Sequence, residues 1–303
     1  MRLLKGYFIN LEESKHRRKR IESHLKSLNL DKQYERFPAA RGTKSESQRL
    51  NLSSGEVGLW KSWLTLLEAE LKNDDEYLLL HILEDDAKLS TQFASTVKEI
   101  ANYSRNLDML ATDMYVNPSI YKALCEQHDN LKNKKKFAIF HDLYTGCTSS
   151  IIITKEKIEK VYNCLEGMFN SGEKLLPIDN FLRLAQKENK IDIARIAPFT
   201  TTIEREDIHC STIQITKNKD KSADLTAALC TILRQELSVE PTPEAVRDIL
   251  QTMQELATAK SHKHNSDRLK RKTIESLLEV AEREKILRYY YKPSLIGQPD
   301  NPQ

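Results

Sequence analysis

The 303-residue sequence lacks several features that mark whole classes of protein. No uninterrupted apolar run reaches the roughly 20 residues that a membrane-spanning helix requires, and the opening MRLLKGYFINLEES has neither the apolar stretch nor the cleavage site of a secretory signal. Its five cysteines are odd in number and include no CxxC pair, which argues against a disulfide framework or a zinc site. A net charge of only +3 argues against a nucleic-acid partner. We therefore expect a cytoplasmic protein with reduced cysteines.

The glycine-rich phosphate-binding motifs are also missing. Neither G-x-G-x-x-G nor G-x-x-x-x-G-K-[ST] occurs, so nothing directly supports a dinucleotide oxidoreductase or a P-loop enzyme. Instead, residues 1–216 alternate short apolar runs with amphipathic segments, which predicts an α/β domain. The expected strands are Lys5–Ile9, Tyr77–Leu83, Met109–Val116, Phe137–Phe140, Ser149–Thr154 and Ile191–Ile196, and the expected helices are Lys15–Ser27, Gly55–Lys72, Thr91–Ala101, Lys155–Phe169 and Asp179–Glu188.

The first predicted strand is followed by a polar turn and a basic helix. The turn at the carboxyl end of a first strand is a common nucleotide-binding position in α/β folds. Asn10 offers an amide to a base or ribose, and Arg17 and Arg18 offer paired hydrogen bonds to phosphate. The alternative is an ordinary polar turn and a solvated basic helix face.

Three consecutive carboxylates, Glu84, Asp85 and Asp86, end the apolar run LLLHIL. Alternation along a strand would place Glu84 and Asp86 on one face, within reach of a common centre. Their mutual repulsion and loss of hydration call for a positive charge there. Mn²⁺ or Mg²⁺ would supply it, since these ions take oxygen ligands and often only one or two carboxylates. The alternative is a strand end with a cap for the next helix.

Two further segments stand at expected helix starts. In SSGEVG, Gly58 falls within the first turns of a helix, where it costs stability unless another segment must come close. In Pro177-Ile-Asp-Asn, the proline turn presents Asp179 at the start of a helix, either as a functional carboxylate or as a helix cap.

Taken together, these motifs resemble glycosyltransferase family 25, which includes bacterial lipooligosaccharide galactosyltransferases. The resemblance rests on five short motifs in the family's order and covers about residues 3–215. They are INLEESKHRR (Ile9–Arg18), FPAARG (Phe37–Gly42), SSGEVG (Ser53–Gly58), ILEDDA (Ile82–Ala87) and LPIDNFL (Leu176–Leu182).

The resemblance implies a GT-A-like fold, a Rossmann-type nucleotide-sugar-binding sandwich that uses a UDP-sugar and Mn²⁺ or Mg²⁺. Asp86, with Glu84 or Asp85, would hold the metal on the diphosphate, and the loop residue His209 is a further candidate ligand. Asn10 and Leu11 would lie beside the uridine, with Arg17 or Arg18 nearby. Asp179 is the favoured general base, with Glu56 and His141 as the other candidates, for inverting transfer of a hexose, galactose by family analogy, to a glycan or glycolipid acceptor such as lipooligosaccharide.

The chain departs from the family pattern at two places. Trp63 stands where a histidine is usual, and Gly146–Ser150 matches only loosely. These departures favour an alternative, a non-catalytic protein that interacts through a helical tail. A third possibility is a metal phosphoesterase.

Residues 217–303 are predicted to form an added, all-helical region. It would close the acceptor site, mediate association, or bring the protein to the cytosolic face of the inner membrane through the basic run at 260–272. A solvated charged helix is the alternative for that run, because four glutamates follow it.

Overall fold

The computed structural model describes residues 2–104, 107–116, 118–141, 143–172, 174–203, 230, 233–235 and 237–240. Strands and helices alternate through most of this range, as the apolar pattern predicts. The strands are β1 (Arg2–Asn10), β2 (Tyr34–Pro38), β3 (Tyr77–Glu84), β4 (Ala87–Leu89), β5 (Met109–Ala111), β6 (Ala138–Phe140), β7 (Ser150–Thr154), β8 (Ile193–Ala197) and β9 (Thr201–Ile203). The helices are α1 (Lys15–Ser27), α2 (Lys44–Leu50), α3 (Ser54–Leu71), α4 (Phe93–Ser104), α5 (Pro118–Asn133), α6 (Ile158–Asn170) and α7 (Ile178–Lys187), with short 3₁₀ turns at Asp31–Gln33 and Lys155–Lys157.

Seven strands form one mixed sheet in the order β2-β1-β3-β7-β5-β8-β6. β1 runs parallel to β2 and β3, whereas β7 is antiparallel to both of its neighbours, β3 and β5. β8 is parallel to β5, and the edge strand β6 is antiparallel to β8. A separate two-stranded sheet pairs β4 with β9. The carboxyl ends of β1, β2, β3, β5 and β8 therefore share one edge of the main sheet.

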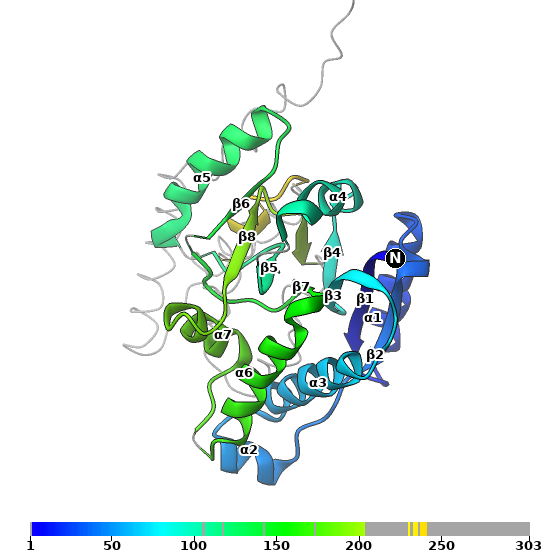
Figure 1. Ribbon diagram of the computed structural model, residues 1–303, viewed down its shortest axis with the longest axis vertical. Helices are drawn as coiled ribbons and strands as arrows, with labels where there is room; N and C mark the ends of the chain where they lie inside the picture. The colour runs from blue at the N-terminus through cyan, green and yellow to red at the C-terminus, as the bar shows by residue number, and fades with distance from the viewer. Residues whose placement is uncertain are drawn as a thin grey trace, which may run out of the picture.

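Helices cover both faces of this sheet, because successive side chains of a strand point to opposite sides. On β3, Leu80 and Ile82 join the core cluster that includes side chains of α3, α6 and α7, whereas Leu79 and Leu83 join the cluster beneath α1 and α4. Figure 1 shows α3 and α6 side by side, with α2 beyond them. The result is a Rossmann-like α/β sandwich, which confirms the predicted α/β class.

The strongly periodic elements were predicted well. α1 matches its expected range, and β3 extends one residue beyond it. Five elements were not predicted, and all but α5 are short: β2, α2, β4, α5 and β9. The expected strand Met109–Val116 is wrong in length, since β5 ends at Ala111 and the chain then bends toward the sheet edge.

A few residues of the 217–303 region fall within the described part of the chain. Leu233 and Leu237 are buried in the larger core cluster with strand and helix residues of the sandwich. Leu237 N–H donates to the Leu233 carbonyl at 3.2 Å, and Phe199 N–H donates to the Leu237 carbonyl at 3.0 Å. The basic run at 260–272 and His209 lie outside the described residues. No helix within the described ranges has the length and apolar character needed to cross a membrane.

Candidate active site

Polar side chains gather at the edge of the sheet where the parallel strands end. β1 ends at Asn10 and β3 at Glu84, and Asp113 follows β5 by two residues. β7 runs the other way, so its first residues, preceded by Ser149, meet these ends. Glu84 N–H donates to the Ser149 carbonyl at 2.9 Å. This edge is where ligands bind in open α/β sheets.

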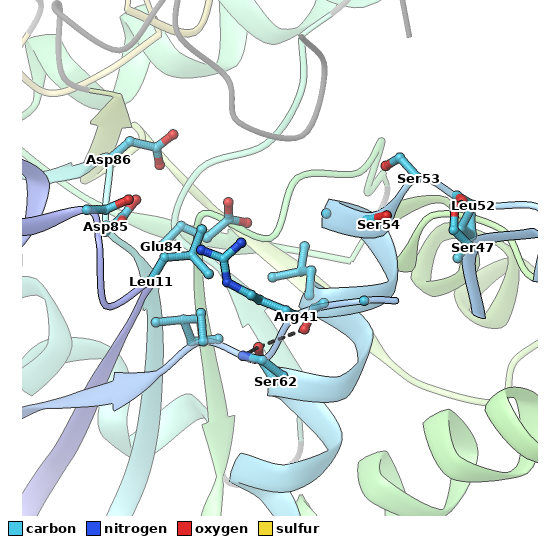
Figure 2. A pocket seen from close by; sticks show the side chains of 18 of the residues that line it. Leu11, Arg41, Ser47, Leu52, Ser53, Ser54, Ser62, Glu84, Asp85 and Asp86 are labelled. Atoms are coloured by element: carbon cyan, nitrogen blue, oxygen red, sulfur yellow. Dashed lines mark hydrogen bonds between the residues drawn. The ribbon is translucent and has the colours of Figure 1, made fainter. Parts of the chain in front are cut away.

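A cavity of about 850 Å³ opens at this edge, and we call it the first cavity. Its volume lies in the usual range for small-molecule sites. One wall carries Glu84, Asp85 and Asp86, and the opposite wall is the start of α3 with Ser53 and Ser54. Figure 2 shows the three carboxylates facing these serines across the opening.

The wall opposite the carboxylates is built by close packing of the 39–42 loop on α3. A Cβ atom on Gly58 would lie 2.5 Å from the Ala40 carbonyl oxygen, so only glycine allows this approach. Ala40 N–H donates to Ser62 Oγ at 2.8 Å, and Ser62 Oγ donates to the Gly58 carbonyl at 2.7 Å. Gly42 N–H donates to the Ser54 carbonyl at 3.2 Å. The motifs FPAARG and SSGEVG therefore form one structural unit.

Asp85 is held by protein donors on both of its oxygens. Arg17 Nη1 donates to Oδ1 at 3.1 Å, and Asn10 Nδ2 donates to Oδ2 at 2.7 Å. Arg36 in turn fixes Asn10, with Nε donating to Asn10 Oδ1 at 3.1 Å. Asp85 is thus neutralised within the protein and braces the turn between β1 and α1.

Glu84 and Asp86 are not neutralised in this way. Burial, followed by the charge of Asp86, raises the pKa of Glu84 to about 8, although Thr148 Oγ1 donates to Glu84 Oε1 at 2.7 Å. Burial, followed by the charge of Asp85, likewise raises the pKa of Asp86. Asp86 Oδ1 is shielded from solvent and has no hydrogen-bond partner among the described residues. Both carboxylates therefore lie where added positive charge would stabilise their ionised form.

An orphaned carboxylate oxygen beside a second carboxylate fits a hard divalent cation. Among the residues that the structure describes, no three His, Cys, Asp or Glu side chains are grouped to hold a metal by themselves. An ion at this place would therefore take Asp86 and Glu84 as protein ligands and complete its shell with water or ligand oxygens, as Mg²⁺ commonly does.

Asp179 lies close to this carboxylate group, in the first turn of α7. Its charge contributes to the raised pKa of Glu84. Burial, and then the charge of Glu56, raises the pKa of Asp179 itself. Asp179 Oδ1 accepts a hydrogen bond from Asn180 N–H at 2.8 Å, and a Cβ on Gly146 would lie 3.5 Å from Oδ2. Pro177 occupies the N-cap position of α7, so Asp179 is not the helix cap.

The other predicted residues fall in different places. Leu11 and Arg17 line the first cavity, whereas Arg18 pairs with Glu22 along α1 at 2.8 Å. Glu56 caps α3, accepting from Ser53 N–H at 2.6 Å. His141 is exposed and lies 3.4 Å from Asp192 Oδ1.

Trp63 and His81 belong to the core of the protein. Trp63 is fully buried in the larger core cluster, so its presence does not alter the cavity wall. His81 is also fully buried, and burial lowers its pKa to about 3. Its ring nitrogens contact side chains, with the Tyr34 hydroxyl at 2.5 Å from Nδ1 and Ser150 Oγ at 2.8 Å from Nε2. His81 is therefore a core residue that side-chain contacts hold in place.

A buried ion pair that the sequence pattern did not predict joins Asp113 and Arg234. Asp113 is fully buried, accepts from Ser149 Oγ at 2.8 Å, and pairs with Arg234. The apolar run before Asp113 is the same signal that marked Glu84, so Asp113 was predictable as a strand-end carboxylate. Arg234 was not, because it lies 121 residues further along the chain and nothing local marks its partner.

Comparison with known proteins identifies the relationship of the chain. The family model described as glycosyltransferase family 25 (LPS biosynthesis protein) matches residues 3–182, which is more than half of the chain. The match includes β1, the carboxylate run and the first turn of α7. A search of the curated proteins finds no match.

Proposed function

Because the chain belongs to glycosyltransferase family 25, whose members act in lipopolysaccharide biosynthesis, we propose that it transfers a hexose from a UDP-sugar to a bacterial surface glycan. Galactose is the sugar, and lipooligosaccharide the acceptor, that the family's motifs suggest. The catalytic domain would then be a GT-A-like version of the Rossmann-like sandwich. The first cavity supports this proposal, because it combines a nucleotide-sized volume with carboxylates at the carboxyl ends of parallel strands.

The nucleoside end of the donor would occupy the part of the first cavity nearest β1. Leu11 and Ile9 give this part apolar surface for a base. Asn10 is engaged by Asp85 and Arg36, so its role is to hold the β1–α1 turn in shape. Arg17 lines the same cavity and carries positive charge toward the diphosphate while it neutralises Asp85.

The diphosphate would lie against the carboxylates through a divalent ion, Mn²⁺ or Mg²⁺. When bound, such an ion acts as a Lewis acid and stabilises the negative charge that develops on the departing diphosphate. Asp86 and Glu84 would hold it. The unpartnered Asp86 Oδ1 and the raised pKa values of both carboxylates support this assignment.

The transfer requires one displacement if the anomeric centre is inverted. The acceptor hydroxyl oxygen bonds to the anomeric carbon, the bond from that carbon to the diphosphate oxygen breaks, and UDP leaves with the electron pair. Asp179 would accept the hydroxyl proton. Its raised pKa and its closeness to the Glu84 group suit a general base beside the donor.

The single observation that carries the proposal is the orphaned oxygen of Asp86 beside the first cavity. Isothermal titration of the full chain with UDP, with and without Mn²⁺, tests it directly. We expect binding that requires Mn²⁺ and that Asp86→Asn abolishes, whereas the exposed control Asp74→Asn binds as wild type. Metal-independent binding, or undiminished binding by Asp86→Asn, would reject the metal-dependent mechanism.

A screen of UDP-sugars for metal-dependent hydrolysis then identifies the donor. Turnover lost on chelation separates an enzyme from a non-catalytic family member. The alternative of an interaction protein rested partly on Trp63, and that residue is part of the core and not of the cavity wall. The proposed peripheral association with the inner membrane depends on residues outside the described ranges.

A further inference from the structure

A second cavity, of about 920 Å³, lies beside α7. Its walls include Tyr144 and Thr145 from the loop before β7, and Asn180, Arg183 and Lys187 from α7. None of these residues lines the first cavity.

Asp179 lines neither cavity, but it is close to residues of both. Asn180, which lines the second cavity, donates its backbone N–H to Asp179 Oδ1, and Gly146, next to Thr145, packs against Oδ2. On the other side, Asp179 is near enough to Glu84, in the first cavity, to raise the pKa of that carboxyl. A general base that takes the acceptor's proton must lie between the donor site and the acceptor site, as Asp179 does if the second cavity holds the acceptor.

The second cavity is rich in positive charge. Arg183 and Lys187 are one helical turn apart on α7, and both are exposed. Within the described part of the chain, neither forms a close ion pair, although the charge of Arg183 acts on Asp179, one turn earlier on α7. Lys160, a third cation of the wall, pairs with Asp108. Among the described residues that line it, one carboxylate occurs, Asp192, which contacts His141. Two unpaired cations on one face suit an anionic group on the ligand.

The same cavity also has apolar surface. Leu176 and Leu184 line it, and they are 41% and 38% exposed, among the few large apolar side chains so exposed in the described residues. Apolar walls with a few charged groups are typical of small-molecule sites. The C–H face of a sugar ring could pack on these leucines while a charged substituent reaches α7.

We propose that the second cavity is the acceptor subsite and that Arg183 and Lys187 select a sugar carrying an anionic substituent, a phosphate or a carboxylate. The identification of this ligand as the acceptor rests on the proposed function, but the binding of an anionic sugar is testable without any transfer reaction. Lys187 and Arg183 act as specificity-determining residues, and neither takes part in the proton transfer.

The test is direct titration of the purified full chain with glucose 6-phosphate, glucuronate, methyl glucoside and inorganic phosphate. The variants are Arg183→Gln/Lys187→Gln and the matched control Lys98→Gln/Lys134→Gln, which removes two exposed charges outside both cavities. Each sample is also titrated with UDP and Mn²⁺, which reports on the first cavity and on folding.

We expect wild type to bind glucose 6-phosphate or glucuronate at least about fivefold tighter than methyl glucoside or inorganic phosphate. The α7 double variant should lose about that preference, because it removes both cations that would contact the anionic substituent, whereas the control should bind as wild type. Equal binding of neutral and anionic sugars, inorganic phosphate binding as tightly as the sugars, an unaffected α7 variant, or an equal loss in the control would each overturn the inference.

A normal UDP titration alongside such a result would leave the proposed function standing, and a failed UDP titration with intact anionic-sugar binding would reject only the proposed function.

Discussion

Arg17 and Asp85, 68 residues apart in the sequence, form an ion pair of 3.1 Å between Nη1 and Oδ1. Asn10 takes the other oxygen of Asp85 at 2.7 Å. The three consecutive carboxylates therefore differ in role, since Asp85 is held by protein donors on both oxygens, whereas burial and neighbouring carboxylates raise the pKa values of Glu84 and Asp86. This division leads to predictions that separate stability from activity.

Asp85→Asn and Asp86→Asn should have opposite effects. Asp85→Asn removes the partly buried carboxylate charge that Arg17 and Asn10 bind and should lower the free energy of unfolding by about 1–3 kcal/mol. Asp86→Asn removes a poorly solvated charge and should leave stability unchanged or slightly higher without metal, while metal-dependent turnover falls at least about a hundredfold. Urea unfolding in chelator and a UDP-sugar hydrolysis assay measure the two. Loss of stability in both variants would contradict the division.

Glu84 should make the protein less stable as the pH rises. The unfolded chain releases this proton near the ordinary value of 4.5, but the folded protein keeps it until about pH 8. Between these values the unfolded state binds fewer protons, so the free energy of unfolding falls with rising pH, by at most about 1.4 kcal/mol per unit. Urea unfolding from pH 5 to 8 in chelator measures the slope. Glu84→Gln should flatten it, and an identical slope in wild type and variant would contradict the raised pKa.

Asp179→Asn should reduce turnover without weakening donor binding. A general base contributes roughly 10²–10⁴-fold to rate, and Asp179 is absent from the first-cavity lining. We therefore expect a kcat lower by that factor with UDP affinity unchanged. His141→Gln is the comparison, because His141, like Asp179, is a candidate base outside the lining of the first cavity. A larger loss of kcat in His141→Gln than in Asp179→Asn would instead identify His141, paired with Asp192, as the general base.

Gly58→Ala should destabilise the wall of the first cavity. The added methyl group would meet the Ala40 carbonyl oxygen at 2.5 Å, which forces the 39–42 loop away from α3. Overpacking of this kind costs about 1–3 kcal/mol, and UDP affinity should fall with it. The matched control is Gly167→Ala in α6, where a Cβ meets nothing within 4 Å. That change should stabilise the helix by roughly 0.5–1 kcal/mol. Similar effects at the two glycines would argue against the close contact.

Trp63→His restores the residue type usual in the family but should behave as a core mutation. Trp63 is fully buried, and truncating a buried tryptophan costs about 3–5 kcal/mol in comparable cores. We expect a large drop in thermal stability and, at a temperature where the variant is folded, no change in UDP affinity. Altered donor preference with little loss of stability would show instead that Trp63 contributes to the donor site.

Local sequence by itself determined the elements whose pattern is strong. The basic amphipathic run became α1 within its predicted bounds, and LLLHIL became the central strand that delivers Glu84 to the sheet edge. The short pieces β2, β4 and β9 escaped prediction because three to five residues carry too little periodicity. Their positions depend on pairing with distant strands.

Only the tertiary structure decided which of the carboxylates are held by protein donors. The sequence shows three adjacent carboxylates but not that Arg17 and Asn10 satisfy Asp85, or that Asp86 Oδ1 has no donor. The sequence also does not show that Arg234 forms an ion pair with Asp113. Charge compensation depends on distance and burial, and both are set by segments that meet only when the sheet and its helices pack together.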